Sequence, residues 1–185
     1  MRVIAGRLRG KKLIPPEDYS VRPTLDRVRE AVFSMIAFEI PEAEVLDLFG
    51  GTGAMAIEAL SRGASRAVVV DKERRSIDLI RKNVSICGLE DKTTIFHEDY
   101  AFFLTKTHKM GNKFDIIFVD PPYHGEMLAT VLKEIDESDI LSEDGYVILE
   151  TDKGVQSAEE TERLIRTKEK VYSKSRICIY RRKQI

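Results

Sequence analysis

Short apolar runs alternate with segments of helical periodicity from Val45 onward, and this alternation limits the possible folds more than any other feature of the chain. Strands are predicted at residues 45–49, 66–71, 93–97, 114–120 and 146–151, and helices at about 54–62, 74–87, 101–108 and 126–135. This βαβ rhythm requires a mostly parallel sheet with helices on both faces. The predicted class is therefore α/β, with a Rossmann-like arrangement.

The pattern changes near the carboxyl end. A helix is predicted at 158–165, followed by strands at 168–172 and 177–181. Only residues 173–176 connect these two strands, and a connection that short permits only an antiparallel pair. We therefore expect a seven-stranded, mostly parallel sheet that ends in an antiparallel hairpin.

The first 14 residues are predicted to form a short β-hairpin or an extended arm, with glycines at positions 6 and 10. Five basic side chains in this arm are unopposed by acids: Arg2, Arg7, Arg9, Lys11 and Lys12. Such an arm suits phosphate binding, because positive charge is local while the net charge of the chain is only -1. A solvated edge strand protected by basic residues explains the pattern equally well.

A proline-bounded linker joins this arm to the rest of the chain. It ends at Arg22-Pro23, and a helix is predicted to begin with Thr24 as its N-cap and to end before Pro41. Residues 1–23 are thus read as arm and linker, and residues 24–185 as the core of a single domain. A length of 185 residues agrees with one domain.

Composition favours a cytoplasmic protein. The two cysteines, Cys87 and Cys178, are far apart and form no redox or metal motif, which indicates reduced thiols. No apolar run approaches the 18 or so residues of a membrane span, and no signal peptide is recognisable. The three histidines share no ligand spacing, so no metal is expected.

A glycine-rich turn follows the first strand of the alternating region. Asp47 and Phe49 lie on that strand, and Gly50, Gly51 and Gly53 form the turn into the next helix. Glycines here let the backbone approach a ligand closely beneath a helix N-terminus. With an acid about 20 residues later, the turn also satisfies the dinucleotide fingerprint, so a nicotinamide-dependent oxidoreductase is an alternative.

Four acids lie at or near the carboxyl ends of successive strands: Asp47, Asp71, Asp99 and Asp120. Carboxyl ends of parallel strands meet at one edge of a sheet, where ligands of α/β proteins bind. A group of acids repels the phosphates of a dinucleotide, but it suits S-adenosylmethionine, which carries a sulfonium, an amine and a ribose and no phosphate.

The stretch Asp120-Pro121-Pro122-Tyr123 ends a buried strand with a stiff turn, because proline cannot continue the ladder. A fixed carboxylate beside an aromatic ring suits a flat molecule with an exocyclic amino group, such as a nucleobase. A strand-terminating turn with an exposed acid is the simpler alternative.

Together these segments resemble a known family. The chain is similar to class I S-adenosylmethionine-dependent methyltransferases, and most closely resembles the RsmD family. The resemblance rests on RVIAGRLRGKKL (2–13), RPTLDRVREAVFSM (22–35), VLDLFGGTGAMAIEALSRGA (45–64) and DPPY (120–123). The pair at 51–52 is Gly-Thr where the family more often has Ala-Ser. The helix predicted from Glu126 and residues 152–176 match only loosely.

The resemblance implies a cofactor, S-adenosylmethionine, and the residues that hold it. Gly51 and Gly53 would pass beneath its methionine part, and Asp71 would hold the ribose. Asp99 and Tyr100 would bind the adenine. Arg22 and Thr24 would close over the amino-acid end, where a guanidinium pairs with a carboxylate.

The resemblance also implies a substrate: the N2 amino group of a guanine in the rRNA of the small ribosomal subunit. Asp120 and the carbonyl of Pro121 would accept hydrogen bonds from that amino group, and Tyr123 would stack on the base. The arm would grip RNA phosphates without reading sequence. A DNA adenine-N6 methyltransferase and a non-catalytic RNA-binding module remain alternatives.

Overall fold

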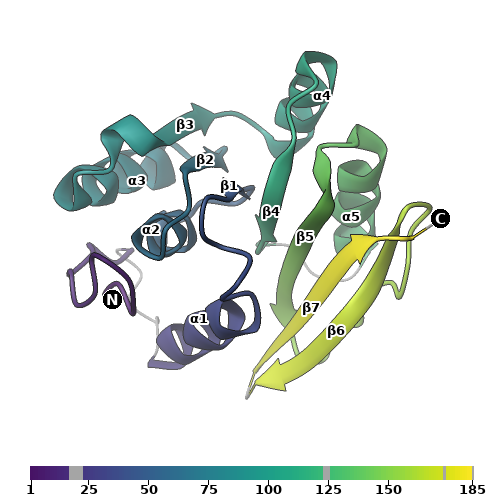
Figure 1. Ribbon diagram of the computed structural model, residues 1–185, viewed down its shortest axis with the longest axis horizontal. Helices are drawn as coiled ribbons and strands as arrows, with labels where there is room; N and C mark the ends of the chain where they lie inside the picture. Colours follow the sequence, from purple (N-terminus) through teal and green to yellow (C-terminus); the bar gives the residue numbers. More distant parts are fainter. Residues whose placement is uncertain (17–22, 123–125, 173, 185) are drawn as a thin grey trace.

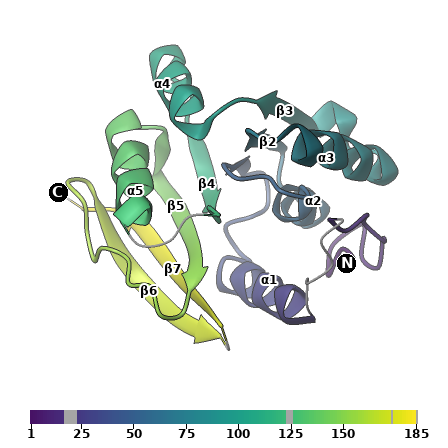
Figure 2. The ribbon, with the colours of Figure 1, turned by 180° about the vertical axis from the view of Figure 1, so that it is seen from behind.

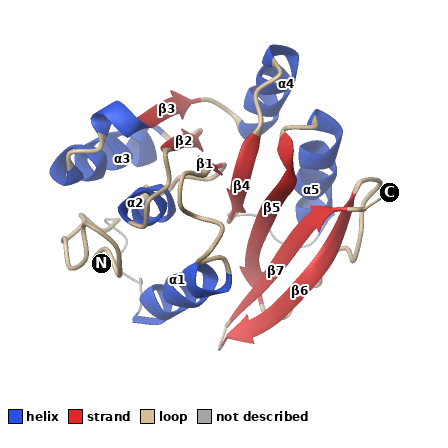
Figure 3. Cartoon of the chain, viewed as in Figure 1, coloured by secondary structure: helices blue, strands red, loops and turns tan. Residues whose placement is uncertain are grey.

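The computed structural model describes residues 1–16, 23–122, 126–172 and 174–184 of the chain (Figure 1). Its helices are α1 (Pro23–Met35), α2 (Ala54–Ser61), α3 (Arg74–Cys87), α4 (Tyr100–Met110) and α5 (Glu126–Ser138), with a short 3-10 helix at Glu90–Lys92. Its strands are β1 (Glu44–Asp47), β2 (Arg66–Asp71), β3 (Thr93–His97), β4 (Phe114–Val119), β5 (Leu141–Asp152), β6 (Leu164–Tyr172) and β7 (Ser175–Arg182). Figure 3 shows helices and strands alternating up to β5.

All seven strands form one sheet in the order β3-β2-β1-β4-β5-β7-β6. The five strands from β3 to β5 are parallel to their neighbours, whereas β7 runs antiparallel to both β5 and β6. The predicted α/β class, the seven strands and the antiparallel carboxyl-terminal hairpin are therefore confirmed. The last strand, β7, lies between β5 and β6 and not at the edge.

Helices cover both faces of the sheet, and Figures 1 and 2 show α1, α2 and α3 grouped apart from α4 and α5. Alternate residues of the strands enter two separate cores, as the period of two in a strand requires. On β4, for example, Ile116 and Phe118 pack with α1, α2 and α3, whereas Ile117 and Val119 pack with α4 and α5. This double burial explains why the central strands read as continuous apolar runs.

Several predicted boundaries agree with the structure, and others shift by a few residues. The strands predicted at 66–71 and 93–97 and the helix predicted at 74–87 have the observed bounds. Helix α1 begins at Pro23, so Thr24 lies in its first turn and is not the N-cap. Proline is favoured in that first turn, because its missing N–H has no partner there in any case.

The helix predicted at 158–165 is wrong. Leu164 instead begins β6, where its side chain is buried and its backbone pairs with Arg182. Just before it, Thr161 forms a turn: its amide donates to the Leu164 carbonyl, and its hydroxyl accepts from the Leu164 amide. A threonine that hydrogen-bonds the nearby backbone competes with helix formation. The partner strand β7 thus overrides the weak helical pattern.

The amino-terminal arm is a hairpin-like turn with one isolated antiparallel bridge, between Arg2 and Lys12. It folds back against α2, whose Glu58 accepts hydrogen bonds from the amides of Ile4 and Ala5 at 2.8 and 3.0 Å. The Arg7 amide donates to the carbonyl oxygen at the end of α2 at 2.7 Å. The arm is therefore docked on the core through its backbone, which leaves its basic side chains exposed.

Candidate active site

The candidate site lies at the carboxyl edge of the parallel strands, on either side of β1. In the sheet, β1 has β2 and then β3 on one side, and β4 and then β5 on the other. A crevice forms where the strand order reverses in this way, and ligands of open α/β sheets bind there. Asp47, Asp71 and Asp120 stand at or directly beyond the ends of β1, β2 and β4, as predicted.

The glycine turn between β1 and α2 is tightly held. The Gly50 amide donates to the Val70 carbonyl at 2.8 Å, and the Gly53 amide donates to the Gly50 carbonyl at 2.7 Å. A Cβ on Gly50 would lie 2.4 Å from a side-chain atom of Val69, and Gly53 has a φ of 77°. Only glycine meets both demands, so the backbone lies open to a ligand at the start of α2.

Asp71 fastens the glycine turn to the end of β2. Its Oδ2 accepts from the Gly51 amide at 2.9 Å and its Oδ1 from the Glu73 amide at 2.8 Å. Each carboxylate oxygen keeps a second lone pair, so Asp71 can still accept from ligand hydroxyls.

Asp99 and Tyr100 line a cavity at this edge of the sheet, which has a volume of about 550 Å³. Phe49, Asp71 and Pro121 also line it. Asp99 caps α4, because its Oδ1 accepts from the Ala101 amide at 2.9 Å. The ring of Tyr100 packs on Phe49 with centroids 5.2 Å apart. The predicted acid at this position therefore has a structural role as well as a place in the cavity wall.

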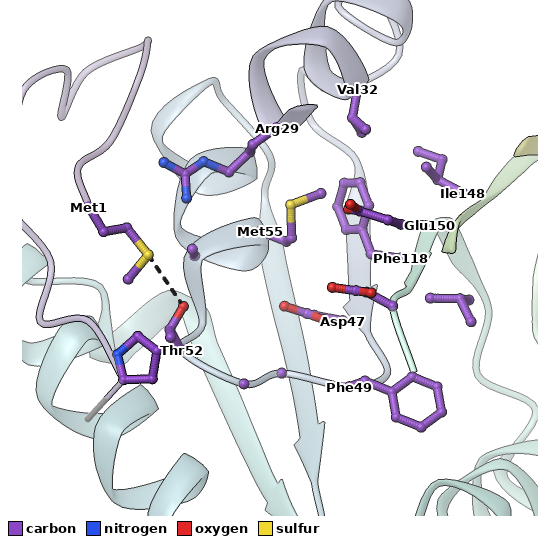
Figure 4. A pocket seen from close by; sticks show the side chains of 16 residues that line it. Met1, Arg29, Val32, Asp47, Phe49, Thr52, Met55, Phe118, Ile148 and Glu150 are labelled. Atoms are coloured by element: carbon purple, nitrogen blue, oxygen red, sulfur yellow. Dashed lines mark hydrogen bonds between the residues drawn. The ribbon is translucent and has the colours of Figure 1, made fainter. Parts of the chain in front are cut away.

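A second cavity, of about 210 Å³, lies on the α1 side of the same edge. Figure 4 shows Asp47 and Glu150 directed into it from the sheet, with Arg29 and Val32 of α1 on the opposite side. Phe49, Gly51 and Asp120 line both cavities. The two hollows therefore adjoin, and Asp120 stands where they meet.

Asp47 is buried and lines the second cavity. Burial, and then the nearby charge of Asp71, raises its pKa to about 7, although backbone hydrogen bonds from Ala56 and Phe49 oppose the rise. Its Oδ2 has no hydrogen-bond partner within the described ranges. A buried carboxylate oxygen without a partner is costly, which indicates that a bound molecule supplies a donor or a positive charge there.

Asp120 and Glu150 continue this acidic wall. They directly follow Val119 and Leu149, which are paired in register on β4 and β5, so both side chains lie on the same face. Desolvation, and then the charges of Glu150 and Asp47, raises the pKa of Asp120, and burial raises the pKa of Glu150. Asp120 is also open to the cavity, so water weakens its shift until a ligand excludes that water.

The other predicted site residues lie at the cavity rim, in α1, in the arm, or outside the part of the chain that the structure describes. Pro121 is buried and Pro122 is exposed at the cavity rim. Tyr123 and Arg22 lie outside the described residues, and Thr24 is placed only by its backbone in α1. In the arm, all five basic side chains are exposed, and none of them makes an ion pair within the described part of the chain: Arg2, Arg7, Arg9, Lys11 and Lys12.

Two charged residues of the smaller cavity, Arg29 and Glu150, were not predicted. Arg29 is 6% exposed and sits beside Val28 and Val32 on the buried side of α1. A charged residue within an apolar helical stripe was the available signal. Glu150 interrupts the apolar run of β5, and its closeness to Asp120 follows only once β4 and β5 are known to pair.

In the ranges that the structure describes, no group of three or more metal-binding side chains is arranged to hold an ion. The same ranges contain no helix that is long and apolar enough to span a membrane.

Comparison with known proteins places the chain in a family. A family model described as "Conserved hypothetical protein 95" matches residues 1–181. The Bacillus subtilis protein named "Putative rRNA methyltransferase YlbH" is 34% identical over 99% of this chain and 100% of its own. "Ribosomal RNA small subunit methyltransferase D" of Escherichia coli is 32% identical over 82% of this chain and 75% of its own.

A solved structure agrees with these relatives. The structure titled "Putative methyltransferase yhhF from Escherichia coli" has a TM-score of 0.85 and 27% identity, and covers 100% of this chain and 99% of its own. The chain therefore belongs to the Conserved hypothetical protein 95 family, the RsmD family of class I S-adenosylmethionine-dependent methyltransferases.

Proposed function

We propose that the protein transfers a methyl group from S-adenosylmethionine to the N2 amino group of a guanine in the rRNA of the small ribosomal subunit. One observation carries this proposal: two adjoining cavities meet at Asp120, and acids line both of them. Acids there favour a cationic cofactor, and the meeting point places an acceptor beside the reactive group. The relatives named as rRNA methyltransferases supply the substrate class.

The residues present fit this cofactor. S-adenosylmethionine supplies an electrophilic methyl group on a positively charged sulfur. The partnerless Oδ2 of Asp47 is a place for its ammonium or sulfonium charge. In the larger cavity, Asp71 would accept from the ribose hydroxyls, and Asp99 and Tyr100 would border the adenine. The glycine turn leaves room for the chain that joins these groups.

The substrate end of the site is built on the turn after β4. The Asp120 carboxylate and the Pro121 carbonyl are acceptors on a stiff support. Guanine N2 is a poor nucleophile, because its lone pair is delocalised into the ring. Two acceptors bonded to its hydrogens draw the amine toward pyramidal geometry and aim the lone pair, so positioning supplies most of the acceleration.

Tyr123 would stack on the base, as the family resemblance implies. The guanine must leave its stack to enter such a pocket, and this costs a few kcal/mol. The exposed basic side chains of the arm would offset part of that cost through phosphate contacts. Since most contacts of this kind carry no sequence information, the choice of guanine depends on the shape of the RNA.

The test is methyl transfer from labelled S-adenosylmethionine to unmodified small subunits, free rRNA and duplex DNA in parallel. We expect labelled rRNA, and N2-methylguanosine after its digestion. Label in DNA alone would support an adenine-N6 methyltransferase and refute the proposal. Label on any atom of rRNA other than guanine N2 would also refute it.

Asp120→Asn tests the acceptor role within the same assay. The amide has nearly the shape of the carboxylate, but it carries no charge and replaces one of the two acceptor oxygens with a donor. We expect transfer to fall by at least about a hundredfold while cofactor binding changes little. Asp115→Asn, in β4 but away from both cavities, is the matched control. Near-normal transfer by Asp120→Asn would exclude the proposed role.

A further inference from the structure

Arg29 is the buried cation of the smaller cavity, and neither the sequence nor the family resemblance assigned it a role. It lies on α1, is 6% exposed, and is the only basic side chain among the described residues that line this cavity. All the other ionisable side chains of the lining are acids: Asp47, Asp120 and Glu150.

The guanidinium of Arg29 is only partly satisfied by the protein. Its Nη2 donates to the Arg2 carbonyl of the arm and to Asp26 Oδ1, the latter at 3.0 Å. Its Nε lies 3.9 Å from Glu58 Oε2, too far for a hydrogen bond, and has no acceptor in the part of the chain that the structure describes. Buried N–H groups without an acceptor are rare, and those that occur call for an unseen partner.

Opposite charges therefore line this cavity. Figure 4 shows Arg29 on the α1 side and Asp47 on the sheet side, with the glycine turn at Thr52 beside them. Asp47 has an oxygen without a donor and Arg29 has an N–H without an acceptor. A zwitterionic α-amino acid group carries both complements, a carboxylate for the N–H and an ammonium for the oxygen.

We propose that Arg29 binds the carboxylate of the cofactor's amino-acid end through its free Nε–H. The inference rests on the proposed function, since it takes the cofactor to be S-adenosylmethionine. Because the same guanidinium holds the carbonyl of Arg2, this residue also connects the cofactor to the RNA-binding arm. Arg22 lies outside the described residues, and a role for it at this end of the cofactor is compatible with one for Arg29.

The test compares two ligands that differ only in the carboxylate: S-adenosylmethionine and decarboxylated S-adenosylmethionine. Isothermal titration calorimetry gives both affinities for the wild type, Arg29→Gln and Arg62→Gln. Arg62 is the matched control, because it also pairs with Glu58, at 2.8 Å, but does not line the cavity. Arg29→Lys is added as a variant that retains the charge and loses the planar fork.

We expect Arg29→Gln to weaken S-adenosylmethionine at least tenfold and to change decarboxylated S-adenosylmethionine by less than about twofold. Arg62→Gln should leave the ratio of the two affinities at its wild-type value, and Arg29→Lys should give an intermediate ratio. An equal loss for both ligands would mean that Arg29 acts only through the fold, and would overturn the inference.

Failure of the proposed function gives a different result. In that case the wild type itself binds neither ligand, and both proposals fall. If Arg29→Gln does not fold, the lysine variant decides: an unchanged affinity ratio in Arg29→Lys would exclude the proposed contact between the Arg29 Nε–H and the carboxylate.

Discussion

Replacing Asp47 with asparagine should make the ligand-free protein more stable, although it removes a predicted cofactor-binding residue. The carboxyl is 3% exposed, and its Oδ2 has no partner within the described residues. The asparagine Oδ1 can still accept from the backbone, where hydrogen bonds from Ala56 and Phe49 reach the carboxyl. Its Nδ2 would replace the partnerless oxygen, and no buried charge would remain.

The size of the effect follows from the shift in pKa. The pKa of Asp47 rises from 3.8 to about 7 on folding. Below pH 3.8 the carboxyl is neutral in both states, and its contribution to stability is fully present. As the pH rises toward 7 the unfolded chain ionises first, so this contribution is lost, and above about pH 7 the loss is constant. Three pKa units correspond to about 4 kcal/mol, of which roughly 2–3 kcal/mol falls between pH 5 and pH 8.

Urea denaturation at several pH values between 5 and 8 measures the effect. The stability advantage of Asp47→Asn over the wild type should grow with pH through this range and level off near pH 8. The control is Asp78→Asn on α3, since Asp78 is 48% exposed and pairs with Arg74. That variant should differ from the wild type by less than about 1 kcal/mol, without a comparable trend.

The same substitution should also change cofactor binding. Asp47→Asn should bind S-adenosylmethionine more weakly than the wild type, because the cation loses an ionised neighbour. In the wild type, cofactor binding should release protons, and affinity should rise with pH up to about 7. A stability difference that does not change with pH would refute the premise that this carboxyl is buried and shifted in the empty protein.

Two further predictions concern the arm. Gly6→Ala should destabilise the docked arm by more than about 2 kcal/mol, because its Cβ would lie 1.9 Å from a carbonyl oxygen of α2. Gly10→Ala is the control, since a Cβ there has open space and should cost only about 1–2 kcal/mol for the positive φ. Hydrogen exchange of the arm amides measures both effects, and equal effects would exclude the clash at Gly6. Changing Arg7, Arg9 and Lys11 together to glutamine should weaken RNA binding and lower the slope of log K against log salt by roughly two; an unchanged slope would show that these side chains make no phosphate contacts.

Much of the fold was predictable because its elements carry local signals. Gly88 ends α3 in the left-handed conformation that glycine favours, which explains why that boundary was predicted correctly. The acids at the strand ends were also predictable, since parallel strands bring their carboxyl ends to one edge. Asp47 and Asp71 lie there as expected.

The wrong and the missing predictions concern residues whose structure or place in the site depends on segments far away in the sequence. Leu164 is in a strand because β7 pairs with it, and no local pattern contains that information. Glu150 belongs to the site because β5 pairs with β4. Arg29 belongs to it because α1 packs over the cavity. The arm resembles an edge strand in sequence, but Glu58 in the middle of α2 binds its backbone, which a reading of nearest neighbours cannot foresee.

The position of β7 has a consequence for the order of folding during synthesis. The chain emerges from its amino end, so β5 and β6 are complete before the strand that joins them exists. Until β7 arrives, β5 exposes one hydrogen-bonding edge and β6 has no partner in the sheet, and such edges invite pairing with other chains. Tyr180 and Cys178 of β7 complete the core that packs with α4 and α5. During synthesis this sheet should therefore be completed in one late step, when β7 enters between two strands made earlier.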